Sequence, residues 1–547
     1  MSAAARLRRL DEHAQIIVLE AGPDVSFASC GLPYYVGGEI ESDDDLLVQT
    51  PQSLKASLNL DVRTNHKVKS LDADTHTVRV IGPDGEYVLT YKKLVLSPGG
   101  APMRPPIAGL DHASVHTLRT VDDARSIRDM VLGAGGKPAT SAVVLGAGFI
   151  GLEAAEGLRM RGLDVTLVEV APHVLPPLER ELAWLVHEEL RRLGIRVVAG
   201  TAASSITDDK GRAVVHLADG ESITTDLVLL STGVAPATAP FKACGLACDD
   251  RGAILTDDFG RTNLADVFAV GDATASVDAV TGARRPVPLA GPANRAGRLV
   301  ADAIAAKSGR PIPQPFGTAI VRVGELTVAM TGANRASLTA ASLSFTTLHT
   351  HALNHAGYFP GASQIHLMVH IDPSSGRLLG AQAVGLAGVD KRIDVLATAM
   401  RAGLKAPDLI DLDLCYSPPY GSAKDPITMV GFLADNVATS QLKLWQPDEL
   451  DWARGQAFIL DVRTPSEFAT GHLPEAVNIP HTQLRQRLDE VKAAAGGRPI
   501  AVLCQSGVRS YIAHRILTAA GLESRSLSGG MLTMRAWLGA EDILVKG

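Results

Sequence analysis

Two of the five cysteines stand in stretches whose neighbours favour sulfur chemistry. Cys30 lies within SFASCGLPYYVGG (26–38), shortly after an apolar run that ends in an acid. Cys504 ends the apolar run IAVLC, and the loop that follows leads into a helical stretch. The thiolate is the reactive form of cysteine, and N–H groups at the start of a helix stabilise it. We therefore predict that both thiols react with sulfur substrates; the alternative for each is an inert thiol.

The loop Cys504-Gln-Ser-Gly-Val-Arg509 is predicted to enclose an anion. Its backbone N–H groups would converge on the cysteine sulfur, and Gly507 permits the tight curve. A compact loop of this kind suits a thiolate or a persulfide. A wider loop of the same design would suit phosphate, so a tyrosine-phosphatase-like activity is the alternative.

The other cysteines and a group of histidines do not predict a metal site. Cysteines with no nearby histidine or second cysteine pair lack the ligand set of a zinc site, and histidines that alternate along a strand need no metal to explain them. The cysteines interpreted as structural are Cys244, Cys248 and Cys415, and the alternating histidines belong to HTHALNHAGYF: His349, His351 and His355.

A nucleotide site is indicated by SAVVLGAGFIGLEAAEGLRMRGLDVTLVEV (141–170). The stretch reads as a strand, the turn Gly146-x-Gly148-x-x-Gly151, a helix, and a second strand that ends in Glu169. Such glycines let the backbone turn sharply and approach a pyrophosphate, which rests on the helix N-terminus. Glu169 would accept a ribose 2′-hydroxyl and repel a 2′-phosphate, so NADH is favoured over NADPH, unless Arg192 or Arg196 lies nearby.

A second dinucleotide site is indicated by TNLADVFAVGDAT (262–274), which delivers Gly271 and Asp272 at the end of a strand. Together with LVLSPGG (94–100) and LLSTGVAPAT (229–238), this stretch resembles the flavoprotein disulfide reductases that bind two dinucleotides. The resemblance covers about residues 1–435 and implies that Gly271 and Asp272 contact FAD. It also implies that Glu20, at the end of IIVLE, holds the adenosine ribose.

The N-terminus departs from that family, which opens with a strand and its own glycine-rich turn. This sequence begins with MSAAARLRRL, which is typical of the helix after that turn. We expect that the start was assigned too late and that a short segment precedes Met1, because a central strand left out of a parallel sheet would expose backbone and apolar surface. A truncated chain with poor flavin affinity is the alternative.

The single cysteine narrows the family. Glutathione-reductase-like members place a second cysteine five residues after the first, and here that position is Tyr35. A mixed disulfide, a persulfide or a sulfenic acid must then be the oxidised state of Cys30. With RLRRL (6–10), NHAGYFPGA (354–362) and CYSPPYGSAKDP (415–426), the Cys30 stretch resembles the coenzyme A-disulfide reductases and their persulfide-reducing relatives.

This resemblance implies a coenzyme A site and a homodimer. Tyr358 and Tyr416 would come from the dimerisation region and reach the partner subunit's active site, to steady the thiolate or protonate a leaving sulfur. Ser29 stands where the family usually has asparagine. The residues implied near coenzyme A are Arg6, Arg9, Ser26 and Ser29.

The C-terminal stretches LDVRTPSEFATGHLPEAVNIP (460–480) and IAVLCQSGVRSYIAHRIL (500–517) resemble a rhodanese domain, with Cys504 and Arg509 as its catalytic residues. We hypothesise that Cys504 gathers sulfane sulfur and passes it to Cys30.

The surrounding elements must position these groups. Alternating apolar runs and Ala-rich helical stretches predict parallel α/β architecture up to residue 310, an antiparallel α+β segment with a helix over 390–404, and a new α/β unit after residue 446. We therefore expect an α/β fold with two Rossmann-like domains, a dimerisation domain and a rhodanese domain. The expected bounds are 1–115 with 256–317 for FAD, 116–255 for NAD, 318–440 for dimerisation and 445–547 for rhodanese.

Composition excludes several other classes. A net charge of −7 disfavours nucleic-acid binding, and apolar runs shorter than about 18 residues disfavour a membrane span. Five scattered cysteines suit a reducing cytoplasm. We predict an NADH-dependent, FAD-containing reductase of coenzyme A disulfide, coenzyme A persulfide or polysulfide. An NADH oxidase or peroxidase that uses a cysteine sulfenate, and a flavin-free sulfurtransferase or sulfur-binding module, are the alternatives.

Overall fold

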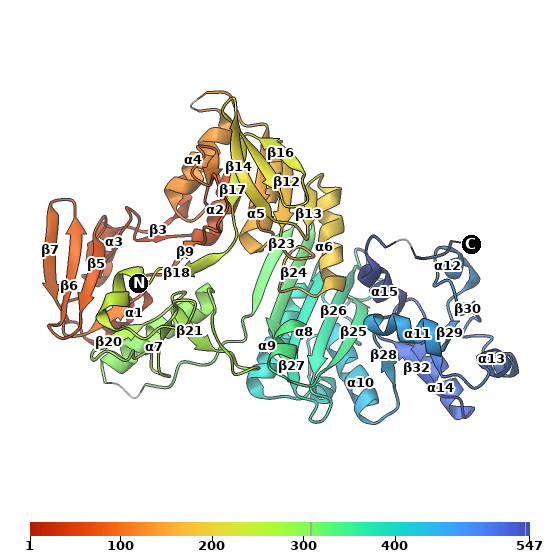
Figure 1. Ribbon diagram of the computed structural model, residues 1–547. Coiled ribbons are helices and arrows are strands. Elements are labelled where there is room, and N and C mark those ends of the chain that lie inside the picture. The colour runs from red at the N-terminus through yellow and green to blue at the C-terminus, as the bar shows by residue number, and fades with distance from the viewer. Residues whose placement is uncertain (135, 307–308, 542, 547) are drawn as a thin grey trace. The chain divides into compact units, whose positions relative to one another are not determined.

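The computed structural model describes residues 1–134, 136–306, 309–541 and 543–546 (Figure 1). The chain divides into two compact units. The first unit comprises Met1–Leu175 and Leu190–Gly317, and the second comprises Pro176–Glu189 and Thr318–Gly547. The mixed α/β architecture expected from the sequence is confirmed.

A five-stranded parallel sheet forms the centre of the predicted NAD region in the first unit. Two of its strands are buried along almost their whole length, which is why they read as continuous apolar runs. Its strands, in spatial order, are β10 (Val115–His116), β17 (Leu227–Leu230), β11 (Ser141–Leu145), β12 (Asp164–Glu169) and β13 (Arg196–Ala199). Helix α5 (Phe149–Met160) joins β11 to β12, and α4 (Val121–Leu132) precedes β11.

The rest of the first unit includes several small sheets and a pair of packed helices. Two parallel pairs, which share no sheet among the described residues, carry the strands expected for the FAD region: β1 (Ile17–Leu19) with β4 (Asp61–Arg63), and β8 (Leu94–Leu96) with β20 (Val267–Ala269). Helix α1 (Ser2–Leu10) packs against α7 (Ala290–Ile304). Two antiparallel sheets are β5 (Lys67–Asp72), β6 (Thr77–Gly82) and β7 (Gly85–Thr90), and β14 (Ala203–Asp209), β15 (Arg212–Leu217) and β16 (Ser222–Thr225).

An antiparallel sheet in the second unit confirms the predicted α+β segment. Its order is β23 (Ala319–Val323), β24 (Leu326–Gly332), β27 (Leu378–Gly385), β26 (Gln364–Ile371) and β25 (Thr346–Leu353). Strands β26 and β27 form the hairpin expected around DPSSG. Helix α9 (Val389–Ala402) matches the helix predicted over 390–404 within two residues, and α10 (Pro426–Ala438) follows it.

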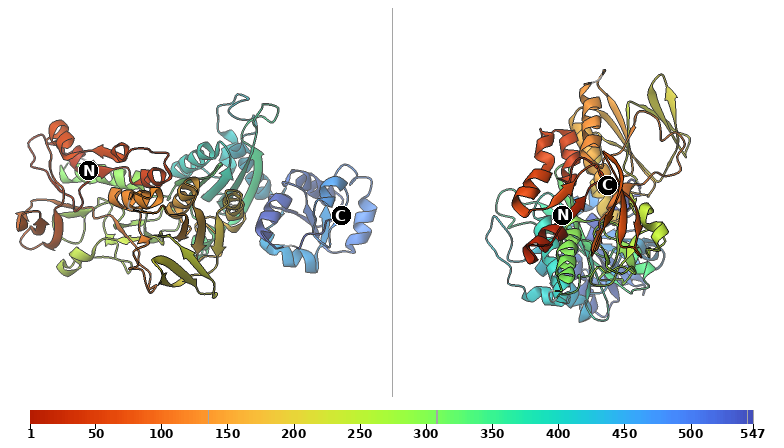
Figure 2. Two further views of the ribbon diagram at one scale, coloured as in Figure 1. Left: turned by 90° about the horizontal axis from the view of Figure 1, so that it is seen from above. Right: turned by 90° about the vertical axis from the view of Figure 1, so that its left-hand side faces the viewer.

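The C-terminal part is a parallel sheet covered on both faces by helices (Figure 2). Its order is β28 (Leu444–Trp445), β32 (Ser524–Leu527), β31 (Ile500–Leu503), β29 (Phe458–Asp461) and β30 (Val477–Asn478). One face packs against α11 (Leu450–Gln456) and α15 (Gly530–Leu538), and the other against α13 (Leu488–Ala495) and α14 (Val508–Ala519). Both faces are therefore buried, as a parallel sheet requires.

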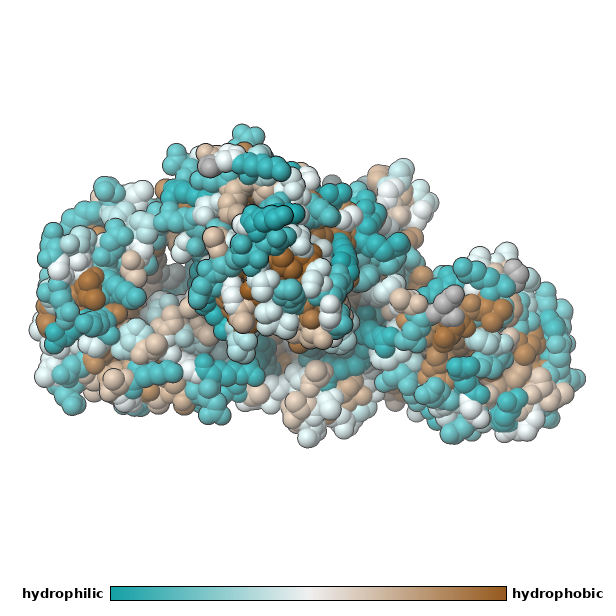
Figure 3. Space-filling view, turned by 45° about the horizontal axis from the view of Figure 1, so that its top comes forward, coloured by the Kyte–Doolittle hydropathy of each residue, from teal (hydrophilic) through white to brown (hydrophobic). Residues whose placement is uncertain are grey.

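The molecular face in Figure 3 is mostly hydrophilic, and its apolar side chains form separate groups. Among the described residues, the structure contains no helix with the length and apolar character needed to cross a membrane.

A buried ion pair fixes the loops that carry the two predicted tyrosines. Arg392 on α9 is 1% exposed, and its Nη2 donates to Asp425 Oδ2 at 2.7 Å and to the Asn354 carbonyl at 2.8 Å. Asp425 also caps α10 by accepting the Ile427 N–H. The pair thus connects the segment before Tyr358 to the segment after Tyr416.

We expect the Asp425→Ala variant to lose about 3–5 kcal/mol of unfolding free energy, because the substitution leaves the Arg392 charge buried without its partner. Denaturant titration of the whole chain measures the effect. Asp394→Asn, an exposed position on α9, serves as the control and should change the unfolding free energy by less than about 0.5 kcal/mol. Equal stability of the two variants would contradict this assignment.

Candidate active site

Cys30 lies on the surface of the first unit, in a short turn of helix (Ser29–Gly31) that runs into α2 (Leu32–Gly37). Strand β2 (Ser26–Phe27) leads into this turn and pairs with β3 (Leu47–Gln49), which comes later in the chain. Gly31 packs tightly there, because a Cβ would come within 2.8 Å of a methyl carbon of Leu46. The exposed thiol can meet a substrate, as the predicted chemistry needs.

Two glycines that sequence reasoning missed bring the cysteine helix against the nucleotide helix. A Cβ on Gly37 of α2 would lie 2.8 Å from the Cα of Gly157 on α5, so the two backbones touch. The Tyr34 hydroxyl donates to Glu153 Oε1 across the same contact at 2.9 Å. Helices approach this closely only where both residues are small, and this contact sets the position of Cys30 relative to the Gly146 turn.

The Gly146 turn has the shape of a pyrophosphate cradle. Gly146 has φ of 103°, and a Cβ on Gly151 would lie 1.9 Å from the Gly146 carbonyl oxygen, so both positions must be glycine. Gly148, the N-cap of α5, has nothing within 4 Å of where its Cβ would be. This open space at a helix N-terminus fits a nucleotide phosphate.

Glu169 ends β12 beside this turn, as predicted, and its carboxylate also organises the backbone. Its Oε2 accepts the Ala147 N–H at 2.7 Å and its Oε1 accepts the Ala171 N–H at 2.8 Å. Arg196 begins β13 and pairs with Thr166, whereas Glu169 pairs with Ala199 at the other end of the same two strands. The Arg196 side chain forms an ion pair with Glu221 at 2.6 Å. Arg196 is therefore not placed to receive a 2′-phosphate beside Glu169.

Gly271 and Asp272 follow strand β20, as predicted. Burial raises the pKa of Asp272, and the nearby Arg119 charge opposes that rise. Within the described residues, no group hydrogen-bonds the Asp272 side chain. A half-buried carboxyl of this kind fits ligand hydroxyl donors, such as those of the FAD sugar chain. Glu20 follows β1, and its Oε1 accepts the Gly22 N–H at 2.8 Å.

The basic residues of α1 have different environments. Arg8 is 4% exposed and donates to the carbonyls of Leu58 and Asn59, so it closes the end of α3 (Pro51–Leu58). Arg6 forms an ion pair with Asp302 of α7 at 2.7 Å, and Arg9 is exposed. The implied coenzyme A contacts of Arg6, Arg9, Ser26 and Ser29 therefore remain predictions.

Tyr358 and Tyr416 come together in the second unit. They are 77% and 50% exposed, and their hydroxyl oxygens lie 3.2 Å apart. The hydrogen bond with Tyr416 raises the pKa of Tyr358. Two exposed phenols in contact suit a role in a site completed by another subunit.

The Cys504 loop has the form expected from the sequence. Cys504 follows β31, and its Sγ is 3.2 Å from the Gly507 N–H and 3.4 Å from the Ser510 hydroxyl. Gly507 has φ of 97° and precedes α14. The residue is 1% exposed, so the sulfur sits at the base of the loop.

Glu467, which sequence reasoning missed, anchors Arg509. The two side chains form a bidentate pair at 2.6 and 2.7 Å, and the Arg509 guanidinium lowers the pKa of Glu467 to about 2. The hydrogen bond to Glu467 is the main cause of the raised pKa of Arg509, and Cys504 makes a smaller contribution. The stretch TPSEF contained the signal, since its acid follows a capping threonine.

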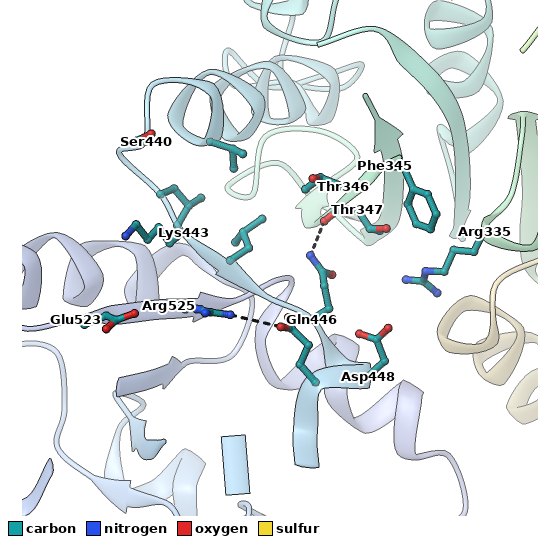
Figure 4. A pocket seen from close by; sticks show the side chains of 14 residues that line it. Arg335, Phe345, Thr346, Thr347, Ser440, Lys443, Gln446, Asp448, Glu523 and Arg525 are labelled. Carbon is teal, nitrogen blue, oxygen red and sulfur yellow. Dashed lines mark hydrogen bonds and ion pairs between the residues drawn. The ribbon is translucent and has the colours of Figure 1, made fainter. Parts of the chain in front are cut away.

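The described residues contain no cluster of three or more histidine, cysteine, aspartate or glutamate side chains that could hold a metal ion. Cys244 and Cys248 pack beside an apolar core cluster. A cleft of about 630 Å³ in the second unit has Arg335, Lys443, Asp448 and Arg525 in its lining, but it contains none of the predicted site residues (Figure 4).

Comparison with known proteins identifies the domains. Residues 1–291 match the family described as pyridine nucleotide-disulphide oxidoreductase, residues 318–425 match its dimerisation domain, and residues 444–536 match a rhodanese-like domain.

Similar proteins cover most or all of the chain. A coenzyme A disulfide reductase of Staphylococcus haemolyticus is 32% identical over 433 residues, which are 79% of this chain and 96% of the relative. An NADH oxidase of Methanocaldococcus jannaschii is 31% identical over 78% of this chain and 95% of the relative.

Two solved structures are similar over nearly the full length. The reduced Bacillus anthracis CoADR-RHD has a TM-score of 0.95 at 38% identity and covers 100% of this chain and 97% of its own. A NAD-dependent persulfide reductase from A. fulgidus has a TM-score of 0.90 at 36% identity and covers 97% of each chain. The chain belongs to the pyridine nucleotide-disulphide oxidoreductase family and carries a rhodanese-like domain at its C-terminal end.

Proposed function

We propose that the protein uses NADH to reduce coenzyme A disulfide, coenzyme A persulfide or polysulfide through Cys30. The single observation that carries this proposal is an exposed, solitary thiol on a helix that touches the nucleotide-binding helix α5. The similarity to a coenzyme A disulfide reductase and to a persulfide reductase supports the substrate class.

The chemistry at Cys30 is an exchange between a thiolate and a disulfide. With coenzyme A disulfide, the Cys30 thiolate attacks one sulfur, forms a mixed disulfide and releases a coenzyme A thiolate. With coenzyme A persulfide, attack on the inner sulfur forms the same mixed disulfide and releases hydrosulfide. A hydride equivalent from NADH then restores the Cys30 thiolate and releases coenzyme A thiol and NAD⁺.

FAD, when bound, supplies the two-electron link between nicotinamide and sulfur. Glu20, Gly271 and Asp272 would hold it, and the half-buried Asp272 carboxyl, which has no hydrogen-bond partner among the described residues, supports this assignment. The Gly146 turn would bind the pyrophosphate of NADH. Glu169 beside it, with Arg196 committed to Glu221, favours NADH over NADPH.

The active unit in this proposal is a homodimer. Tyr358 and Tyr416 would approach the thiol of the partner subunit and donate a proton to the leaving sulfur. Tyr358, whose pKa is raised by the hydrogen bond with Tyr416, carries its proton at neutral pH. Arg6, Arg9, Ser26 and Ser29 would bind coenzyme A. The free thiols Cys30 and Cys504 suit a reducing, cytoplasmic setting.

The rhodanese domain would supply sulfur. The Cys504 thiolate takes the outer sulfur of a persulfide donor and releases the donor thiolate, while Arg509 favours the anionic donor. A coenzyme A thiolate then takes that sulfur from Cys504, and the coenzyme A persulfide formed is the substrate of Cys30.

A second candidate function is NADH oxidation by oxygen or peroxide through a Cys30 sulfenate. The similarity to an NADH oxidase of Methanocaldococcus jannaschii favours it. Oxygen consumption during NADH oxidation without any sulfur substrate separates the two functions.

We expect Cys30→Ser to lower NADH oxidation with coenzyme A disulfide on the order of a thousandfold, because the covalent step is lost. Flavin absorbance, and bleaching of that absorbance by NADH, should persist. Cys415→Ser, which removes the other exposed thiol, is the matched control and should retain activity. Full activity of Cys30→Ser would refute the assignment.

Two glycine variants separate nucleotide binding from folding. Gly148→Ala meets open space, so stability should change by less than about 0.5 kcal/mol, while NADH binding weakens about tenfold because the methyl group faces the phosphate. Gly151→Ala meets the Gly146 carbonyl and should destabilise the fold by about 1–3 kcal/mol. NADH titration and thermal unfolding measure both effects, and unchanged NADH affinity of Gly148→Ala would contradict the cradle.

The relay makes a prediction of its own. Cys504→Ser should slow NADH oxidation with polysulfide by about tenfold or more, because the sulfur acceptor is lost, and should leave coenzyme A disulfide reduction unchanged. Steady-state rates with both substrates measure this difference. Equal polysulfide rates for Cys504→Ser and the wild type would exclude the relay.

A further inference from the structure

Two histidines of the dimerisation sheet face the rhodanese domain. His349 and His351 alternate along β25, so their side chains project from the same face of the sheet. His349 is 4% exposed, and strand β26 and the segment Ser528–Thr533 pack around the pair. The histidines that alternate along this strand therefore form a contact between the dimerisation sheet and the rhodanese domain.

Hydrogen bonds join both histidines to the segment that follows β32. Ser528 Oγ lies 2.8 Å from His349 Nδ1 and 3.2 Å from the His349 backbone N–H. His351 Nε2 lies 2.8 Å from Thr533 Oγ1. Ser528 and Thr533 are 2% and 1% exposed, so these bonds are shielded from water. We call these four residues the histidine seam.

The residues between Ser528 and Thr533 also contact the Cys504 loop. A Cβ on Gly529 would lie 2.7 Å from the Cβ of His349, whereas a Cβ on Gly530 would lie 2.5 Å from the Cys504 carbonyl oxygen. The Met531 N–H donates to that same carbonyl at 2.8 Å, and the Leu532 N–H donates to the Gln505 carbonyl at 3.0 Å. Two adjacent glycines thus connect the seam to the loop.

The protonation states of the rings follow from their partners. His349 Nε2 donates to Glu181 Oε1 at 2.9 Å, so its Nδ1 accepts from Ser528 when the ring is neutral. Burial lowers the pKa of His349, opposed by Glu181 and supported by the charge of Arg335. Burial also lowers the pKa of His351. It lowers the pKa of His366, the hydrogen-bond partner of His351, to about 4. Burial therefore favours the neutral form of these rings.

A second bond reaches the same strand from the rhodanese side. Gln446, which follows β28, donates from Nε2 to the Thr347 carbonyl of β25 at 3.0 Å (Figure 4). Strand β28 pairs with β32, the strand that ends at the seam. The Gln446 bond and the bonds of the histidine seam therefore both hold β32 and the segment after it against β25.

We propose that His349 and His351 are positioning residues for the sulfur-carrying loop, acting through Ser528–Thr533 on Cys504. The inference rests on the proposed sulfur-transfer role of Cys504. The loop keeps the Gly507 N–H 3.2 Å from Sγ only while its carbonyls are held by Met531 and Leu532. Loosening the seam weakens that N–H bond, and the thiolate then forms less readily.

The test measures Cys504 directly in the full-length protein. Alkylation by iodoacetamide is followed by mass spectrometry of the Cys504 peptide across pH 6 to 10, with the Cys30 peptide as internal reference. We expect His351→Leu and Thr533→Val to raise the midpoint pH of Cys504 alkylation and to slow its rate at pH 7 about tenfold, because the loop loses its support. Thr533→Ser keeps the hydroxyl and should restore both values.

His355→Gln is the matched control, because this buried histidine follows the same strand and its Nδ1 faces the Ala356 carbonyl. It should leave Cys504 alkylation unchanged. If His351→Leu does not fold, Thr533→Val decides alone. Alkylation profiles of the seam variants that match the wild type overturn the positioning role.

Incubation with thiosulfate tests the underlying function separately, by the mass of one added sulfur on the Cys504 peptide. Loading of the wild type and slower loading of His351→Leu support the proposal. Failure of the wild type to load sulfur counts against the sulfur-transfer role, and the alkylation profiles then show independently whether the seam orders the thiolate.

Discussion

Backbone N–H groups at the turn from a buried strand into a helix must find an acceptor, and both reactive regions of this protein are built on that constraint. In the nucleotide turn, Gly146 has positive φ and the Ala147 N–H donates to Glu169. In the sulfur loop, Gly507 has positive φ and its N–H donates to Cys504 Sγ. An acid at the end of one strand and a sulfur at the end of the other meet the same requirement.

Contacts between helices and strands then set the positions of the reactive turns and of the loops that carry the tyrosines. Gly37 and Gly157 let α2 and α5 touch, so the helix that follows Cys30 packs against the helix that follows the Gly146 turn. A buried ion pair between α9 and α10 connects the two loops that present the tyrosines. Such buried pairs are more valuable for fixing one arrangement than for net stability, because burying the charges costs much of what their attraction returns.

The predictions that succeeded concern local pattern. Continuous apolar runs correctly predicted parallel strands, and alternation around DPSSG correctly predicted the antiparallel hairpin. The features that were missed depend on partners far away in the chain. Arg8 resembles a solvated helix residue, yet it is buried against the end of α3. Glu467 holds Arg509 across 42 positions; the capping pattern in TPSEF marks the acid but does not identify this distant partner.

The sequence alone determined the strand, turn and helix around the Gly146 turn and the Cys504 loop. Hydrophobic periodicity, glycine positions and acids at strand ends all indicate structure within about twenty residues. The sequence also determined that Cys30 stands without a second cysteine at Tyr35. Only the tertiary structure decided that the cysteine helix packs on the nucleotide helix, and that His349 and His351 bind the segment behind Cys504. Those contacts join residues more than a hundred positions apart, and only the packed arrangement of the elements determines which side chains then meet.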